Sequence, residues 1–391
     1  MVKEYNILKH SNIHVRMYYS NGTLLDRDIY NNLVEFSESI DESVNNAKIE
    51  ESCGNFTSIG ECFDKDLEAA EWLKNYMNSY DGSPTLYDLA RRSSYKTCEG
   101  DIGLNWNGRG YKTILEVMLQ QYPDPSQQLS VVDNILLNKE VTRIIWNNNT
   151  QVDVLCTDNT SYTADHVIFT ASLGVLKASH DTIFEPGLPA EKVDAIKKIG
   201  FGAIMKIILH FPYTWWNTTQ HYAFIWSAED EDRILTEFGK GPVKNGRSWL
   251  TSNVIFFTGE NNPQVLIGFF AGDMILEIEQ ENDDVLIAGC MYMFRKFLGR
   301  EFNNITDPDD MIKSTWRVNP HFRGTYSFEH ASNNQQGLPD KLAAPITGEN
   351  GNPRIMFAGE ATHPYFFSTV HGAIESGYRE ADRLIRYYAP A

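Results

Sequence analysis

The 391-residue chain lacks long apolar runs, an excess of positive charge and closely spaced cysteines. No run of about 18 apolar residues occurs, so the sequence predicts no transmembrane helix. Lys and Arg number 34 against 52 Asp and Glu, which gives a net charge of −18. This balance argues against nucleic acid as a partner, because neutralising phosphates requires excess cations. An acidic protein attracts small cations through its long-range field, although acidity also simply aids solubility.

The cysteines are odd in number and widely spaced, which is not a metal-binding pattern: Cys53, Cys62, Cys98, Cys156 and Cys290. Cys53 and Cys62 could pair in a secreted protein, although reduced thiols are the simpler expectation. The start of the chain has no apolar signal core, and its end is not an SKL tail. As written, the chain indicates the cytoplasm, while N-x-[ST] sequons at six asparagines slightly favour secretion.

Patterns of both secondary structures occur along the chain. Residues 13–24 alternate around Asn21-Gly22, which predicts a hairpin. Apolar residues at helical spacing predict helices over 28–50, 65–80, 112–121, 284–298 and 370–387. Strands are predicted over 130–137, 141–146, 152–156, 166–170, 203–211, 253–257, 264–270 and 354–358, with Asp158-Asn159 turning between 152–156 and 166–170. This mixture indicates α+β pieces woven with an α/β domain.

Residues 354–385 combine an apolar strand, a turn and an amphipathic helix. The strand runs into Gly359 and Glu360, and Ser368 or Thr369 stands where a helix would be capped. Such a helix start offers free N–H groups and partial positive charge to an electron-rich ligand. An ordinary strand, turn and well-capped helix would carry the same pattern.

Two further segments invite a chemical interpretation. Residues 316–328 gather aromatic side chains around Gly324, which fits either a binding wall or a packed loop end. Lys206 interrupts the apolar run of residues 201–211, where a buried charge would need a partner or a lowered pKa. Alternatively, Lys206 lies on an edge strand and reaches water.

The run GEATH, FSTVHGAIESG and YREADRLI, together with the WRVNPHFRGTYSF segment, resembles flavin-containing amine oxidases of the polyamine oxidase type, such as spermine oxidase and N1-acetylpolyamine oxidase. The resemblance implies their two-domain fold, α/β plus α+β, with a discontinuous FAD domain. Residues 1–105 and 179–345 would form the substrate domain, and residues 106–178 and 346–391 a partial FAD domain. It also implies noncovalent FAD, because Thr325 stands where covalent relatives place cysteine.

The resemblance assigns cofactor contacts to specific positions. Gly359 and Glu360 would line the ribityl and phosphate region, while Thr369 and Val370 would offer backbone N–H groups to the isoalloxazine. The backbone of Val141 would contact the adenine end.

Other positions would serve the amine and oxygen. Ser368 and Thr369 would border the substrate channel, and Trp316 and Tyr326 would wall the flavin and the amine cavity. Lys206 would hold a water near flavin N5 and assist the reaction with oxygen, which makes it the predicted catalytic residue.

The implied activity is polyamine catabolism: a polyamine such as spermine, spermidine or an acetylated form is oxidised to an aldehyde and a shorter amine, and O2 becomes hydrogen peroxide. Because the amine must be neutral to deliver its hydride, activity should rise with pH. No metal site is expected, and the sequence assigns no oligomeric state.

The chain has no G-x-G-x-x-G loop of the kind that binds a dinucleotide pyrophosphate; Gly108–Thr113 lacks the third glycine. We therefore expect the family's amino-terminal βαβ segment to be missing. This leaves open a flavin-free binding or regulatory protein. Among related oxidases, Thr325 disfavours a monoamine oxidase and the absence of a long helical insertion disfavours a histone demethylase. Arg323 leaves an L-amino-acid oxidase possible.

Overall fold

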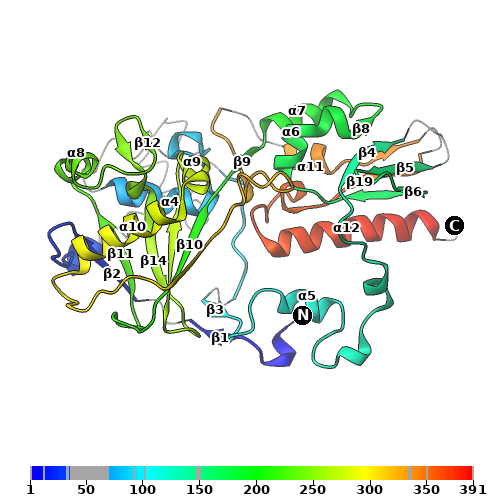
Figure 1. The fold of residues 1–391 in the computed structure, drawn as a ribbon. Helices are drawn as coiled ribbons and strands as arrows, with labels where there is room; N and C mark the ends of the chain where they lie inside the picture. The colour runs from blue at the N-terminus through cyan, green and yellow to red at the C-terminus, as the bar shows by residue number, and fades with distance from the viewer. Residues whose placement is uncertain are drawn as a thin grey trace.

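The computed structural model describes residues 2–11, 14–31, 35, 70–90, 93–100, 103–146, 151–332, 337–348 and 351–389. Most of the predicted helix at 28–50, the start of the one at 65–80, and Cys53 and Cys62 lie outside these residues. The described part is a mixed α/β structure of two lobes, one on each side of Figure 1.

The first lobe is built on a six-stranded sheet. Its strands follow the order β16 (Asp310–Lys313), β10 (Met205–His210), β15 (Val265–Phe270), β14 (Asn253–Thr258), β11 (His221–Ile225) and β2 (Val15–Tyr19). Neighbours are antiparallel except β11 and β2, which pair in parallel. The hairpin predicted after β2 is confirmed by the bridge between Tyr18 and Leu24.

Strand alternation decides which residues of β10 are buried. Met205, Ile207 and Leu209 are fully buried in the main hydrophobic cluster, so Lys206 projects from the opposite face. Helices cover the buried face: α8 (Ala228–Glu237), α9 (Ile275–Gln280) and α10 (Asp283–Met293), which continues as a π-helical turn (Phe294–Leu298). The other face carries α4 (Ala70–Asp81), whose Trp72 indole donates to the Val254 carbonyl at 2.6 Å.

The second lobe has two small sheets. One orders β18 (Ile346–Thr347), β19 (Pro353–Phe357) and β7 (Val167–Phe169), and the other β6 (Ser161–Ala164), β5 (Val152–Cys156), β4 (Val141–Ile145) and β8 (Phe184–Glu185). The helices of this lobe are α6 (Leu173–Ile183), α7 (Ala190–Lys198), α11 (Leu338–Ala343) and α12 (Val370–Tyr388). A second cluster of buried side chains joins these sheets to α6, α7 and α11.

Short elements connect the lobes and extend them. β9 (Gly200–Gly202) pairs with β17 (Tyr326–Phe328) between the two lobes. Smaller elements lie at the periphery: β1 (Lys9–His10), β3 (Leu104–Asn105), α5 (Thr113–Met118), β12 (Val243–Lys244) and β13 (Arg247–Ser248). None of the helices within the described ranges is long and apolar enough to cross a membrane.

One predicted strand and one predicted hairpin were wrong. The segment predicted as a strand at 130–137 contains a 3-10 helix (Ser130–Asn134), most of its apolar side chains are exposed, and it has no partner strand among the described residues. The turn at Asn159 is present, with φ of 63°, but it joins β5 to β6, whereas β7 pairs in parallel with β19. The predicted domain boundary at 178/179 falls within α6, and the division into domains stays a prediction.

Candidate functional site

The turn between β19 and α12 begins at Gly359, whose φ of 138° is a conformation that disfavours side chains. Its N–H donates to the Ser376 hydroxyl of α12 at 2.8 Å, which ties the strand end to the helix. No heavy atom lies within 4 Å of the position a Cβ would take there, so the backbone borders open space.

Glu360 follows, and its carboxylate joins three segments of the chain. One oxygen accepts hydrogen bonds from the Ser327 hydroxyl at 2.7 Å, the Ser327 N–H at 3.3 Å and the Ser368 N–H at 2.7 Å. The Ser368 hydroxyl in turn donates to the Ser327 carbonyl. Burial raises the pKa of Glu360, although these donors oppose the shift. The carboxylate therefore fixes β17 against the start of α12.

Thr369 is the N-cap of α12. Its hydroxyl accepts from the Gly372 N–H at 3.1 Å and donates to the Phe366 carbonyl at 2.6 Å. No acceptor among the described residues is bonded to the N–H groups of Val370 and His371. In Figure 1 this end of α12 points towards the lobe that contains the six-stranded sheet. The helix thus presents unpaired amides and its positive end to the space between the lobes.

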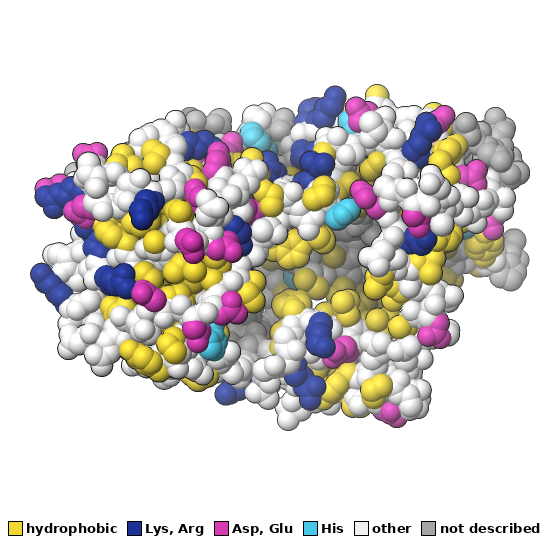
Figure 2. Space-filling view, viewed as in Figure 1, with side chains coloured by type: hydrophobic (Ala, Val, Ile, Leu, Met, Phe, Trp, Pro, Cys, Tyr) yellow, Lys and Arg dark blue, Asp and Glu magenta, His cyan; other side chains and the backbone are white. Residues whose placement is uncertain are grey.

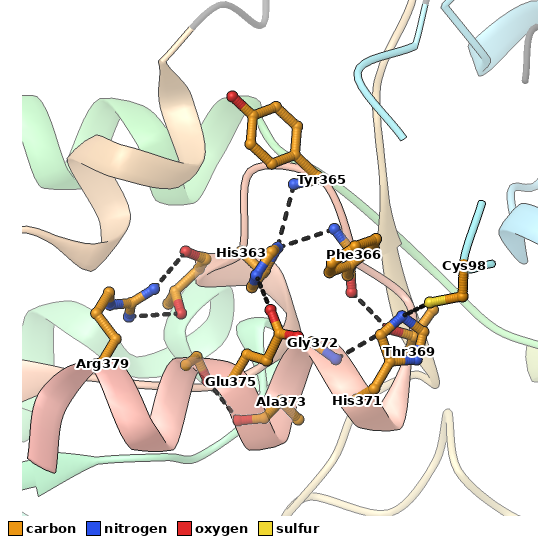
Figure 3. A network of polar contacts seen from close by, with 12 residues as sticks. Cys98, His363, Tyr365, Phe366, Thr369, His371, Gly372, Ala373, Glu375 and Arg379 are labelled. Carbon is orange, nitrogen blue, oxygen red and sulfur yellow. Dashed lines mark hydrogen bonds and ion pairs between the residues drawn. The ribbon is translucent and has the colours of Figure 1, made fainter. Parts of the chain in front are cut away.

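A polar network holds this helix start in place (Figure 3). His363 Nδ1 accepts from the Tyr365 N–H at 3.2 Å and the Phe366 N–H at 2.9 Å, while its Nε2 lies 3.0 Å from Glu375. An Nδ1 that accepts two amides leaves the proton on Nε2, so His363 donates to Glu375. On the next turn, Arg379 donates to the Thr362 carbonyl at 2.9 Å.

A thiol–imidazole contact that the sequence did not predict lies beside the cap. Cys98 Sγ lies 3.1 Å from His371 Nε2, and burial lowers the pKa of His371. The segment that carries Cys98 is held by Lys96, whose N–H donates to the Tyr365 carbonyl at 3.0 Å. No local signal could have revealed this pair, because its members are 273 positions apart.

Lys206 lies on the face of β10 that turns away from the main hydrophobic cluster. Its side chain keeps contact with water, and its Nζ lies 5.6 Å from the centre of the Phe269 ring. Partial burial lowers its pKa, and no carboxylate of the described residues forms an ion pair with it. Its backbone is clamped by Ser314, whose hydroxyl accepts from the Lys206 N–H at 2.8 Å.

The two predicted aromatic residues have different surroundings. Tyr326 is largely buried, its hydroxyl donates to the Ser79 carbonyl at 2.7 Å, and burial raises its pKa. Trp316 stays 43% exposed, with its ring edge-on to Phe322 at 4.8 Å between centroids. Tyr326 thus adjoins the Glu360 network through Ser327, whereas Trp316 follows the segment that clamps Lys206.

The predicted positions therefore form two groups with one outlier. The first, which we call the Glu360 cluster, contains Gly359, Glu360, Ser368, Thr369, Val370 and Tyr326, which joins it through the neighbouring Ser327 that the structure adds. The second contains Lys206 and Trp316, linked through Ser314. The continuous backbone of β9 and β10 connects them, because Gly202 pairs with Tyr326. Val141 lies apart at the start of β4, 39% exposed, and pairs with Cys156.

This donor set fits one edge of a flavin. Unpaired amides at a helix start suit the electron-rich pyrimidine edge of such a ring, and the open space at Gly359 permits close approach. Figure 2 shows the surface hollowed between the lobes, with hydrophobic side chains gathered along the hollow. No metal-ligating cluster occurs among the described side chains.

Comparisons with known proteins agree with this chemistry. The sequence model of the "Flavin containing amine oxidoreductase" family matches residues 68–385. The chain is 33% identical to the peroxisomal N(1)-acetyl-spermine/spermidine oxidase of Homo sapiens, over 72% of this chain and 55% of the relative. It is 31% identical to the probable polyamine oxidase 5 of Arabidopsis thaliana, over 83% and 63%.

A third relative, the possible lysine-specific histone demethylase 1 of Drosophila melanogaster, is 31% identical over 58% of this chain and 25% of its own length. The chain spans about half the length of the acetylpolyamine oxidases that it matches. The family match covers most of the chain, including both lobes and the whole Glu360 cluster, and the chain belongs to the flavin-containing amine oxidoreductases.

Proposed function

We propose that the protein uses noncovalently bound FAD to oxidise a polyamine to an aldehyde and a shorter amine. The substrate would be spermine, spermidine or an acetylated form. The observation that carries the proposal is the capped start of α12, where the amides of Val370 and His371 have no acceptor among the described residues and lie near the open backbone of Gly359. When bound, the flavin accepts a hydride equivalent from the amine carbon and passes electrons to O2, which yields hydrogen peroxide.

The chain's own residues position the reactants. The amides of α12 would hold the pyrimidine edge of a bound flavin, and Glu360 keeps the helix start and β17 in register by accepting from Ser368 and Ser327. Thr325 replaces the tethering cysteine of covalent relatives; its N–H donates to the Gly202 carbonyl at 2.9 Å, so it serves the bend between β9 and β10.

Lys206 supplies a cation from the opposite lobe. Since partial burial lowers its pKa, the ammonium releases a proton more readily than a fully hydrated lysine does. We assign it two roles: it holds a water, and its positive charge stabilises the negative charge that develops where oxygen is reduced. Trp316, on the segment clamped to Lys206 by Ser314, lines the amine path in this proposal.

A visible absorption spectrum of the purified chain tests cofactor binding first. The expected result is a flavin spectrum whose pigment is released intact by denaturation, which also shows that the bond is noncovalent. A colourless protein that takes up no added FAD would instead support a flavin-free binding or regulatory protein.

Turnover then tests the substrate. Peroxide formation is measured with spermine, N1-acetylspermine, leucine and a methylated histone peptide. We expect the polyamines to be oxidised and the other two to be inert. Oxidation of leucine or the peptide, with no polyamine turnover, would overturn the assignment.

A further inference from the structure

A pocket of about 730 Å³ opens between the lobes beside the β9–β17 ribbon. Phe328 of β17 lines it, whereas the neighbouring Ser327 bonds to Glu360. Its walls come from α6 and α7 of the second lobe and from residues 317–332 of the first. Phe201 and Phe328 contribute apolar surface to it. In Figure 2, Lys and Arg side chains gather on the side of the molecule where Figure 1 places α6 and α7.

The pocket is cationic in a strongly acidic protein. The described residues that line it include five Lys or Arg side chains: Lys177, Lys197, Lys198, Arg317 and Arg323. The single carboxylate that lines the described part of the pocket, Asp88, lies 3.5 Å from the His330 imidazole. The chain as a whole carries 52 acidic against 34 basic residues, so this concentration departs from the general charge pattern.

Most of these cations form no ion pair with a carboxylate of the described residues, although the Glu279 carboxylate acts on Arg317 electrostatically. Lys198 pairs with Asp194 at 2.8 Å. The other four form no ion pair with a carboxylate in the described part of the chain: Lys177, Lys197, Arg317 and Arg323. A surface built only for solubility would not gather like charges, because their mutual repulsion opposes folding.

Main-chain carbonyls hold two of these cations in position. Lys177 Nζ donates to the Ile196 carbonyl at 2.7 Å and to the Lys197 carbonyl at 3.1 Å. Arg317 donates to the Arg323 carbonyl at 2.9 Å. These acceptors carry no net charge, so the positive charges stay available for a ligand, and each cation loses little freedom on binding one.

The backbone at Arg323 supports a functional interpretation. The φ of Arg323 is 60°, which is unfavourable for a residue with a side chain. A glycine, such as the neighbouring Gly324, adopts positive φ values at less cost. The turn is fixed by the Asn319 carbonyl, which accepts from the Phe322 and Arg323 amides at 3.1 and 2.9 Å. The fold thus maintains a strained turn that places a guanidinium at the pocket.

We propose that this pocket binds a small polyanion, a ligand that carries two or more phosphate or carboxylate groups. The planar guanidinium of Arg317 or Arg323 can donate two N–H groups to two oxygens of one carboxylate or phosphate group, and both lobes contribute residues to the pocket wall. The site differs from that of the amine, because its charge repels a polyamine. A ligand bound here would connect α6 and α7 to the 317–332 segment. That segment begins directly after Trp316, which the proposed function places on the amine path.

Lys177 provides a signature that distinguishes this pocket from other basic surfaces. Burial lowers the pKa of Lys177 to about 8, so near pH 8 part of the population is neutral. An anion in the pocket favours the charged form and raises this pKa, so binding takes up protons. The heat of binding should therefore depend on the ionisation enthalpy of the buffer at pH 8.

Isothermal titration of the 391-residue chain at low ionic strength tests the proposal, with tripolyphosphate and citrate as probes. We expect one saturable site per chain with proton uptake at pH 8, and the tighter probe identifies phosphate or carboxylate as the ligand group. The variant Lys197→Gln/Arg323→Gln should bind about tenfold or more weakly. The matched control is Lys240→Gln, an exposed lysine outside the pocket, which should bind within about twofold of the parent chain.

Absence of saturable binding by both probes, or equal weakening in the Lys240 variant, would overturn the proposal. Should the double variant unfold, Lys197→Gln alone retains the test, since Lys197 lies exposed at the end of α7. The readout is binding heat and needs no flavin, so it is independent of the oxidase proposal.

Discussion

Glu360 shows how one side chain can fix a site that three distant segments build. Its partly buried carboxylate accepts from two amides and one hydroxyl, on Ser327 and Ser368. Ser368 itself has φ of 62°, a strained conformation for a residue with a side chain. The carboxylate therefore compensates for strain at the position where α12 must begin.

Replacing Glu360 separates this structural role from charge. Glu360→Ala leaves buried donors unsatisfied, so we expect the free energy of unfolding to fall by about 1–3 kcal/mol. Glu360→Gln keeps an acceptor in place and removes a buried charge, so it should lose less. Denaturant titrations of both variants measure the difference, and equal losses would contradict the assigned role.

Replacing Lys206 should change the rate of reaction with O2 more than the stability of the fold. In the flavin-loaded protein, Lys206→Met should slow reoxidation by O2 on the order of 10²-fold, because it removes a cation from the place where charge develops. Reduction by the amine should change far less. Stopped-flow measurements of the two half-reactions separate these effects, with Lys240→Met as the control. Similar slowing of both half-reactions would point to a general structural defect.

The stability of the helix α12 depends on its N-terminal cap at Thr369. Thr369→Ala removes the acceptor for the Gly372 N–H, so we expect a loss of about 1 kcal/mol of stability together with weaker flavin binding. Thr369→Ser retains a hydroxyl and should behave like the parent chain. Thermal melts and flavin titrations test both effects. If flavin binding is unchanged in Thr369→Ala, the cap does not contribute to the cofactor site.

The carboxyl end of α11 is capped by a buried lysine, which predicts a pH effect. Lys192 Nζ donates to the Leu342 and Ala344 carbonyls, both at 2.6 Å, and burial lowers the pKa of Lys192 to about 7. In the unfolded chain this pKa is about 10.4. Between these values the unfolded state binds the proton and the native state does not, so stability rises with pH.

Lys192→Met should remove that rise. The free energy of unfolding of the parent chain, minus that of the variant, should increase between pH 7 and 10 by up to about 1.4 kcal/mol per pH unit. Taking the difference cancels other groups that titrate in this range, including Lys177. A pH-independent difference would show that Lys192 stays charged in the fold.

Elements with their own periodic pattern were predictable from the sequence. β10 alternates and α12 carries a long amphipathic stripe, so both were predicted close to their observed bounds. Pairings between distant segments were not, because no local pattern encodes them. The partner of β7 is β19, with Val167 opposite Ile355, and this parallel register is decided by packing.

The same limit applies to the site. Gly359, Glu360 and Thr369 could be singled out because they occupy one strand–turn–helix segment, and the structure places them together. Ser327 and His371 gain their contacts from Glu360 and Cys98 through tertiary structure alone. The exposed 3-10 helix (Ser130–Asn134) was mistaken for a strand because a short apolar run does not distinguish the two.

Across the whole molecule, the distribution of charge follows the division into two lobes. The chain is strongly acidic overall, yet cations gather in the pocket between α6, α7 and the 317–332 segment. The amides of α12 face the hollow from one lobe, and β10 carries Lys206 in the other. A polyamine, as proposed here for the substrate, would be attracted by the long-range field of the molecule and repelled locally by the cationic pocket.

That field predicts a salt dependence that grows with substrate charge. Between about 20 and 200 mM salt the Debye length shrinks from about 20 to about 7 Å, so long-range attraction is largely screened. For the flavin-loaded protein, kcat/KM for spermine, with four amines, should fall several-fold over this range, chiefly through KM. The doubly acetylated form, with two charged amines, should show a smaller fall and provides the matched control. Equal salt responses of the two substrates would show that the net charge of −18 aids solubility without steering the amine.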